Sequence, residues 1–183
     1  MTRRTNKIIL TGYRATGKST VGRLLAARLG FEFLDLDEEI VRRAGRSIRE
    51  MVATYGWEYF RDLERQALRD LVERDRVVVA TGGGAILHRE AWQALKKTGL
   101  VVWLTADLAT IGQRLRADQA TAAQRPSLTG QDVLTEVAAV LAERQPLYQA
   151  GSHLTIDTAT LSAEQAAATI VRALEAEDLA SPQ

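Results

Sequence analysis

The residues with the most specific chemistry lie at positions 12–19, where the sequence reads GYRATGKS. This stretch matches the pattern G-x-x-x-x-G-K-[ST], which wraps backbone N–H groups around the phosphates of a nucleotide. Its lysine, Lys18, is expected to reach the β- and γ-phosphates, and the hydroxyl of Ser19 to ligate Mg²⁺. A helix that begins near Lys18 would point its positive end at the same anion. The pattern therefore predicts a nucleotide-binding phosphate loop.

A second candidate group is a pair of carboxylates, Asp35 and Asp37, separated by a single residue. If both belong to a strand, they point to the same face, because residues two apart in a strand do so. One carboxylate could then hold Mg²⁺ through water, and the other could accept a proton or a hydrogen bond from a substrate hydroxyl. The alternative is a solvated strand end followed by an acidic helix start, since Glu38 and Glu39 continue the negative charge. Their place one βαβ unit after the start of the first predicted strand favours the functional interpretation.

Three consecutive glycines, Gly82, Gly83 and Gly84, follow an apolar run of the sequence. Three glycines in a row carry a large ordering cost, so their presence asks for a reason. One reason is a tight turn between a strand and a helix, and the other is a backbone that packs directly against a ligand. The position at the carboxyl end of a predicted strand favours the ligand.

The arginines are less informative on their own. On a helix, Arg61 would neighbour Glu64 at i+3, and this carboxylate could fix the guanidinium so that its other edge meets an anionic substrate. An ordinary surface ion pair explains the same spacing, and the sequence alone favours that simpler explanation. Arg125 and Arg144 likewise give no signal by themselves.

Composition excludes several other chemistries. The 183 residues include no cysteine and only two histidines, which removes disulfides, thiol catalysis and a polyhistidine metal centre. The net charge of +1 does not call for nucleic acid or an anionic membrane as a partner. The apolar runs fall well short of the roughly 20 residues that a bilayer span needs, and the first of them is too short for a signal peptide. We therefore expect a globular cytoplasmic protein.

The elements that must position these residues alternate between strands and helices. Short apolar runs predict five strands, at residues 7–11, 33–36, 77–81, 100–105 and 153–157. Helical patterns lie between and after them, at residues 18–29, 47–55, 57–74, 88–97, 108–115, 133–144 and 162 to about 175. This alternation predicts an α/β fold in one domain over residues 1–183, with a parallel sheet covered by helices on both faces. The polar segment 118–127, which ends near Arg125-Pro126, is either a surface loop or a mobile lid.

Taken together, these residues resemble the shikimate kinase family over nearly the whole chain. The resemblance rests on motifs in a fixed order: the phosphate loop, Asp35-x-Asp37, Gly56-x-x-x-Phe60-Arg61-x-x-Glu64, the triple glycine, Arg125-Pro126 and Arg144-x-Pro146-Leu147-Tyr148. It implies a five-stranded parallel sheet of order 2-3-1-4-5 in a P-loop kinase fold, with a substrate-binding region at about residues 35–65 and a lid at about 115–128. It also implies ATP-dependent phosphorylation of shikimate to shikimate 3-phosphate, a step in chorismate and aromatic amino-acid biosynthesis.

The resemblance further implies a role for each site residue. The catalytic residues would be Lys18, Asp37 and Arg125, the last of them in the lid that closes over ATP. Mg²⁺, the expected cofactor, would be served by Ser19 and, through water, by Asp35. Shikimate would be bound by Asp37, Arg61, Gly82, Gly83, Gly84 and Arg144, with its carboxylate between the two arginines. ATP would be bound by Gly12, Ala15, Thr16, Gly17, Lys18, Ser19, Thr20, Arg114 and Arg125, although the nearby Arg116 could take the place of Arg114 against the adenine.

The chain departs from the family pattern at three places. Leu36 stands where threonine is common, the lid reads Arg-Pro-Ser-Leu, and the stretch between Leu115 and Arg125 is longer than in many members. These differences concern lid length and adenine contacts rather than the chemistry. We expect ATP and shikimate as partners, no nucleic acid or membrane, and a monomer.

Other functions stay open from the sequence. Another small-molecule P-loop kinase, such as a gluconate kinase, would share the phosphate loop but should lack the two arginines in this arrangement. A non-catalytic nucleotide-binding regulator is a candidate from a different class. A GTPase that reads guanine through Asn-Lys-x-Asp is excluded, because the single asparagine, Asn6, precedes the first predicted strand. Quinate is an open alternative to shikimate as the acceptor.

Overall fold

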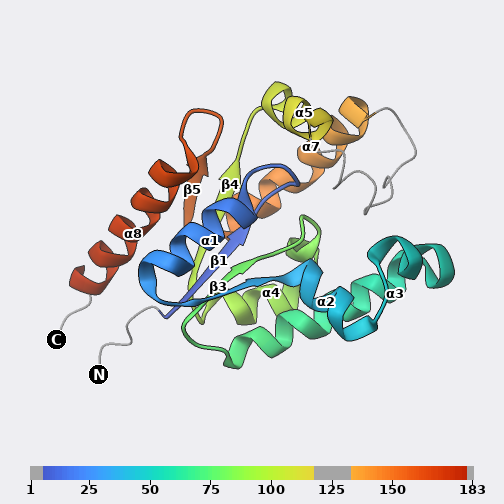
Figure 1. Ribbon diagram of the computed structural model, residues 1–183, viewed down its shortest axis with the longest axis horizontal. Coiled ribbons are helices and arrows are strands. Elements are labelled where there is room, and N and C mark those ends of the chain that lie inside the picture. Colours follow the sequence, from blue (N-terminus) through green and yellow to red (C-terminus); the bar gives the residue numbers. More distant parts are fainter. Residues whose placement is uncertain (1–5, 118–132, 181–183) are drawn as a thin grey trace.

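The computed structural model describes residues 6–117 and 133–180. Five parallel strands form one sheet in the order β2-β3-β1-β4-β5, which confirms the predicted fold class and strand order (Figure 1). The strands are β1 (Lys7–Thr11), β2 (Glu32–Asp35), β3 (Val77–Ala80), β4 (Leu100–Thr105) and β5 (Leu154–Asp157). Their order places β1 at the centre, so the phosphate loop that follows β1 lies at the middle of the carboxyl edge, where open α/β sheets bind ligands.

Helices cover both faces of the sheet, which explains why its central strands are apolar without alternation. Ile8 and Leu10 of β1 pack into a core shared with α1 and α8, whereas Ile9 between them packs into a core shared with α3, α4 and α7. Figure 1 shows α1 and α8 together on one side and α3 and α4 on the other. These helices are α1 (Lys18–Leu29), α3 (Ile48–Asp70), α4 (Arg89–Lys96), α7 (Val133–Gly151) and α8 (Ala163–Ala180).

The segment after β2 differs from the sequence prediction. The strand ends at Asp35, and Leu36 begins a helix, α2 (Leu36–Ala44), which was considered only as the alternative of an acidic helix start. The Asp35 carboxylate accepts hydrogen bonds from the backbone N–H groups of Asp37 and Glu38, so Asp35 is the N-cap of α2. The acidic first turn that follows is favourable beside the positive end of a helix. The prediction that Asp35 and Asp37 share a strand face is therefore wrong: one is a cap and the other lies in a helix.

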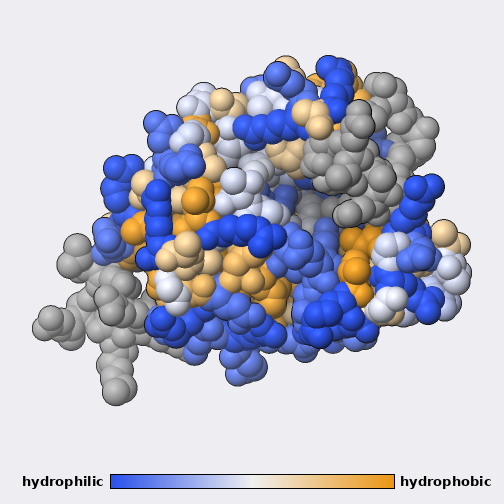
Figure 2. Space-filling view, in the orientation of Figure 1, coloured by the Kyte–Doolittle hydropathy of each residue, from blue (hydrophilic) through white to orange (hydrophobic). Residues whose placement is uncertain are grey.

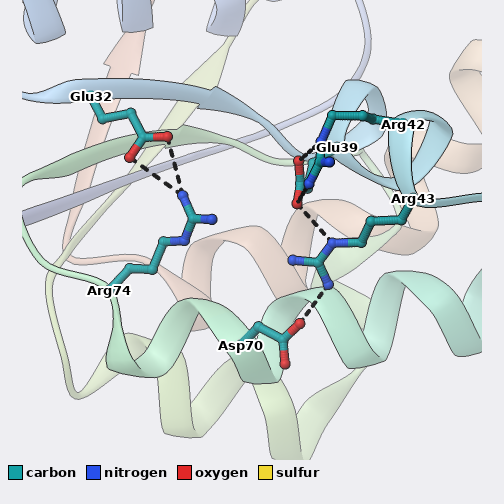
Figure 3. A network of polar contacts seen from close by, with 6 residues as sticks. All are labelled: Glu32, Glu39, Arg42, Arg43, Asp70 and Arg74. Atoms are coloured by element: carbon teal, nitrogen blue, oxygen red, sulfur yellow. Dashed lines mark hydrogen bonds and ion pairs between the residues drawn. The ribbon is translucent and has the colours of Figure 1, made fainter.

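Charged side chains hold α2 against α3. Glu39 accepts hydrogen bonds from both Arg42 and Arg43, and Arg43 also contacts Asp70 near the end of α3 at 2.5 Å (Figure 3). A separate pair in the same view, Glu32 with Arg74, links β2 to the residue after the short helix η1 (Leu71–Glu73). The first group ties the helix that carries Asp37 to the helix that carries Arg61.

Helices α3 and α7 extend beyond the bounds that the sequence predicts for single helices. The predicted pair 47–55 and 57–74 corresponds to one helix, α3, which ends at Asp70 and is followed by η1. The helix is interrupted at Gly56, whose φ of 82° and ψ of 171° are not helical. The predicted capping box is confirmed, since Ser47 and Glu50 bond reciprocally. Helix α7 was predicted to end at Arg144, but it continues through Pro146 to Gly151. The last turn is fixed by packing, because Tyr148 is fully buried and Trp92 donates to the Gly151 carbonyl at 2.9 Å.

The remaining described elements are the short helix η2 (Ala85–Leu87), which follows the triple glycine, and α5 (Leu108–Ala117). The predicted lid at about 115–128 begins at the end of α5, and its residues from 118 onward, Arg125 included, lie outside the described residues. Among the helices of the described part of the chain, none combines the length and apolar character needed to cross a membrane.

Candidate active site

The phosphate loop between β1 and α1 adopts a backbone that few residue types tolerate. Gly12 has φ of 137°, and a Cβ there would lie 2.2 Å from the Leu104 carbonyl oxygen, so only glycine fits. Ala15 and Gly17 also have positive φ, at 61° and 89°. The Thr16 hydroxyl donates to the Tyr13 carbonyl at 2.7 Å and braces the loop from inside. The loop therefore leads directly into the N-terminus of α1, whose free N–H groups and dipole favour an anion.

The side chain of Lys18 folds back over this loop. Its Nζ donates to the carbonyls of Gly12 at 2.8 Å and Tyr13 at 2.7 Å. Lys18 also lines the main cavity of the described structure. These contacts hold a positive charge at the mouth of the loop, where the phosphates of a nucleotide are expected to lie.

The hydroxyl of Ser19 and the carboxylate of Asp35 meet beside the loop. Ser19 Oγ donates to Asp35 Oδ2 at 2.9 Å, while Asp35 Oδ1 accepts the two backbone bonds that cap α2. Hydroxyl and carboxylate oxygens are ligands of a hard cation such as Mg²⁺, which usually takes one or two protein groups and completes its shell with water and phosphate. The described residues contain no cluster of three acidic or histidine side chains that would hold a metal by itself. The pair therefore fits a cation shared with a nucleotide.

A cavity of about 960 Å³ joins most of the predicted residues. It is large enough for a nucleotide and a small second substrate. The predicted residues that line it are Ala15, Gly17, Lys18, Ser19, Thr20, Asp35, Asp37, Gly82, Gly83 and Arg114. Figure 2 shows the surface hollowed between the α5 side and the α2 side of the molecule. Asp37 thus reaches the same space as Asp35, but from the first turn of α2 rather than from a strand.

Five predicted residues of the described structure do not line this cavity. Two of them, Gly12 and Thr16, belong to the phosphate loop itself. The other three, Arg61, Gly84 and Arg144, lie on other segments. Gly84 contacts Arg61 itself, because a Cβ on Gly84 would meet Arg61 Nη1 at 2.1 Å. The three glycines therefore have different surroundings. Gly82 and Gly83 line the cavity, and Gly84 leaves space for the Arg61 guanidinium.

Arg114 joins the phosphate loop to the end of β5. Its guanidinium donates to the carbonyl of Ala15 at 3.2 Å and to the hydroxyl and carbonyl of Thr158 at 3.1 and 2.6 Å. Arg116 is exposed and does not line the cavity, so the geometry favours Arg114 for the predicted contact with the nucleotide. Thr158, whose hydroxyl also contacts the Thr16 carbonyl at 3.0 Å, was missed, because a threonine after a strand carries no motif.

Arg61 is held on several sides. Its Nη1 donates to Glu64 Oε2 at 2.5 Å, and its guanidinium carbon lies 5.6 Å and 5.5 Å from the ring centroids of Trp57 and Phe60. Glu64 is fully buried and also contacts His88 Nε2 at 3.0 Å. Burial by itself would raise the pKa of Glu64, but the hydrogen bond with His88 and the charge of Arg61 keep that pKa below its usual value. The ordinary surface pair considered from the sequence is therefore wrong for this position.

Arg144 is a buried arginine with no acidic partner in the described part of the chain. Only 7% of it is exposed, and its buried Nε has no hydrogen-bond partner among the residues that the structure describes. Across residues 6–117 and 133–180, no carboxylate forms an ion pair with it. A buried, unpaired charge is costly, so Arg144 is a candidate for binding an anion. One helical turn later, the Tyr148 hydroxyl donates to the Gly83 carbonyl at 2.5 Å, which connects α7 to the cavity wall.

A second ion pair connects the phosphate loop to α7. Arg14, which lines the cavity, contacts Glu136 at 2.9 Å, and Glu136 is 1% exposed. Sequence reasoning missed this pair, since the variable positions of the phosphate loop are not constrained by its motif. It also gave no role to His88 or Tyr148, whose partners are distant in the chain.

The sheet order, the phosphate loop at its carboxyl edge and the carboxylates that face the loop define a P-loop kinase. The sequence model of the family described as shikimate kinase matches residues 14–175. The shikimate kinase of Nitratidesulfovibrio vulgaris is 50% identical over 149 residues, which cover 81% of this chain and 85% of that protein. The chain therefore belongs to the shikimate kinase family.

Solved structures agree with this assignment. The shikimate kinase from Acinetobacter baumannii in complex with shikimate matches with a TM-score of 0.88 at 35% identity, over 96% of each chain. A gluconokinase from Sinorhizobium meliloti matches with a TM-score of 0.55 at 18% identity, over 98% of this chain and 99% of that one, and so shares the fold alone. The comparisons confirm the predicted family and favour it over the gluconate kinase alternative.

Proposed function

We propose that the protein transfers the γ-phosphoryl group of ATP to a ring hydroxyl of shikimate, giving shikimate 3-phosphate and ADP. One observation carries the proposal: a single cavity joins the phosphate loop to Asp37 and to the backbone of Gly82 and Gly83. A phosphate donor and a hydroxyl acceptor can therefore meet there. Two observations support an acidic acceptor: membership of the shikimate kinase family, and a buried Arg144 that has no ion-pair partner across residues 6–117 and 133–180.

The phosphate loop and α1 are proposed to bind the phosphates of ATP. The backbone N–H groups from Ala15 to Thr20 bind the phosphates, and Lys18 offsets the negative charge that develops on the transferred group. Arg114 lies on the nucleotide side of the cavity and contacts the loop at Ala15. Arg125, outside the described residues, is proposed to add a second positive charge from a lid at about 115–128 and to help exclude water, which would compete as acceptor.

Ser19 and Asp35 are proposed to hold Mg²⁺, Asp35 through water. Their oxygens meet at 2.9 Å beside the loop, which supports a shared cation. When bound, Mg²⁺ supplies charge neutralisation for the β- and γ-phosphates. Asp35 has a second task in this chain, since it also caps α2 and so fixes the backbone that carries Asp37.

Residues of α2, α3, α7 and the triple glycine are proposed to bind the acceptor, shikimate. Asp37 is proposed to accept the proton of the attacking hydroxyl as the new P–O bond forms and the bond to the β,γ-bridging oxygen breaks, leaving ADP. Arg61 and Arg144 are proposed to bind the carboxylate of shikimate, and the guanidinium fork gives orientation as well as charge. Binding energy at the carboxylate then positions the hydroxyl at the other end of the ring.

Residues 1–183 are proposed to form a single kinase domain, with substrate-binding residues at about 35–65. A cytoplasmic monomer is proposed as its working form. The absence of cysteine is consistent with a reducing compartment.

The test is coupled release of ADP from Mg²⁺-ATP with shikimate, quinate, gluconate and water as acceptors. The proposal expects release to depend on shikimate, with gluconate no better than water. Lys18→Met should keep the thermal melt and lose turnover, which excludes a contaminating kinase. Release without shikimate, or a preference for gluconate, would overturn the proposed function.

A further inference from the structure

The contact between Glu64 and His88 has no place in the proposed chemistry, although it lies directly behind a proposed substrate arginine. Glu64 Oε2 contacts two groups, Arg61 Nη1 at 2.5 Å and His88 Nε2 at 3.0 Å. Arg61 and Glu64 belong to one helix, whereas His88 lies at the N-cap position of α4. We propose that His88 is a positioning residue, which fixes the Glu64 carboxylate and thereby orients Arg61 toward the acid group of the substrate. This inference rests on the role proposed for Arg61.

The ion pair between Arg61 and Glu64 within α3 does not by itself fix the orientation of the Arg61 guanidinium. An arginine and a glutamate at i and i+3 attract each other weakly, and both side chains have several rotatable bonds. A hydrogen bond from a different element removes much of this freedom, because it holds Glu64 at its far end. The buried carboxylate also needs strong donors to remain ionised, and the lowered pKa of Glu64 is in accord with that need.

The position of His88 supports positioning over local capping. A residue at an N-cap commonly uses its side chain to accept a bond from the first turn of its own helix. The His88 side chain makes no such bond to α4, and the side chain is 8% exposed. Its Nε2 is directed instead at a carboxylate 24 positions earlier in the chain.

One short segment therefore contacts both Arg61 and the carboxylate that pairs with it. The guanidinium lies close against Gly84, where a Cβ would overlap with Nη1. Four residues later, after η2, His88 anchors the carboxylate that binds the same Nη1. Gly83, at the start of this segment, lines the cavity. The segment that faces the acceptor thus also sets the direction of the arginine that recognises it.

The first experiment compares His88→Leu with His88→Gln, whose amide nitrogen can replace Nε2 as a donor. Loss of a charge-assisted contact corresponds to roughly a tenfold or greater change in affinity. His88→Leu should therefore raise KM for shikimate about tenfold, with kcat and KM for ATP within about twofold of wild type. His88→Gln should restore KM to within about threefold. Arg89→Leu, an exposed neighbour on α4, is the matched control and should change none of these values.

The second experiment asks whether His88 acts through Glu64. In a Glu64→Gln background, His88→Leu should raise KM for shikimate by less than about twofold, because contacting residues are not additive. Equal factors in both backgrounds, an unchanged KM in His88→Leu, or a His88→Gln variant as poor as His88→Leu would each overturn the proposal.

A third measurement needs no substrate. Exchange of the Arg61 guanidinium protons with water, followed by NMR and assigned with Arg61→Lys, should accelerate in His88→Leu but not in His88→Gln. If the wild type does not phosphorylate shikimate, the proposed function fails, and this measurement still decides the role of His88. Unchanged exchange in His88→Leu would refute the positioning role.

Discussion

Arg61 and Arg144, the two arginines proposed to bind the acid group, lie in opposite electrostatic environments. Arg61 is paired with the buried Glu64 and packs between aromatic rings and Gly84. Arg144 is almost fully buried and has no acidic partner among the described residues. Arg61 is therefore held in place by the chain itself, whereas Arg144 is proposed to keep its charge for the substrate.

This difference predicts a trade between stability and binding at Arg144. Arg144→Met keeps much of the volume and removes an unpaired buried charge, so the free energy of unfolding should rise by about 1 kcal/mol or more. Shikimate binding should weaken by about 1.5–3 kcal/mol, because one charge-assisted contact is lost. ATP binding should not change. Urea unfolding and calorimetry with each ligand provide the measurements.

Arg89→Met, at an exposed position, is the control for the general effect of adding methionine. It should leave unfolding and both affinities as in wild type. A less stable Arg144→Met protein that binds shikimate normally would assign Arg144 to the structural core instead.

The two aspartates, although both line the cavity, predict different responses to magnesium. Asp37→Asn removes a base but keeps a similar shape, so turnover should fall by about 10²–10⁴-fold with little change in the Mg²⁺ requirement. Asp35→Asn should instead raise the Mg²⁺ concentration needed for half-maximal rate, since Asp35 contacts Ser19. Asparagine still caps a helix well, so α2 should persist. Titration of Mg²⁺ in both variants decides; the reverse pattern would exchange the two roles.

At the scale of elements, the sequence predicted best where a local pattern determines the structure. The apolar strands, the glycines of the phosphate loop and the Ser47 capping box follow from neighbouring residues. The helix start at α2 was passed over in favour of a longer strand, because Asp35 both ends the strand and caps the helix, and an alternating Asp-Leu-Asp fits either element. Helix α7 passes Pro146 because its last turn is held by Tyr148 and Trp92, which no local pattern reveals.

The site follows the same rule. Residues of the phosphate loop and Asp35 could be placed from their motifs. Other contacts of the site are tertiary and join segments that are distant in the chain. They link Glu64 to His88, and Arg114 to Thr158. The i, i+3 spacing predicts that Glu64 contacts Arg61, but it does not show that Glu64 is buried. That burial changes the pair from a weak surface contact into a fixed one.

The network between α2 and α3 predicts an acid-sensitive contribution to stability. The hydrogen bond from Arg42, with further help from Arg43, lowers the pKa of Glu39 from its usual 4.5 to about 2 (Figure 3). A lowered folded-state pKa means that the contribution is fully present above the unfolded value and is lost as pH falls toward 2. Glu39→Gln should therefore be less stable than wild type at pH 6, and this difference should shrink steadily between about pH 4.5 and 2.

Urea unfolding at pH 6, 4 and 3 measures that difference. Glu58→Gln, in α3 and outside the network of Figure 3, is the control and should follow the wild-type profile. A stability difference between wild type and Glu39→Gln that is independent of pH would mean that the network contributes through packing rather than through charge.

At the scale of the whole molecule, the sheet order brings the functional segments to one edge. The phosphate loop follows the central strand β1, the triple glycine follows the neighbouring β3, and α2 follows β2. The other neighbour, β4, leads to α5 with Arg114, and α7 returns with Arg144 before β5. The proposed nucleotide contacts therefore come mainly from the loop after β1, from α5 and from the end of β5, while the proposed acceptor contacts come from the β2 and β3 side and α7.

This edge of the sheet is proposed to bind an acid by its carboxylate and thereby to present its hydroxyl to ATP. The most direct test compares kcat/KM for shikimate with that for its neutral methyl ester in the wild-type enzyme. Two charge-assisted contacts of about 1.5–3 kcal/mol each predict a preference for shikimate of at least about a hundredfold. Equal values for acid and ester, or no phosphorylation of shikimate at all, would contradict the account.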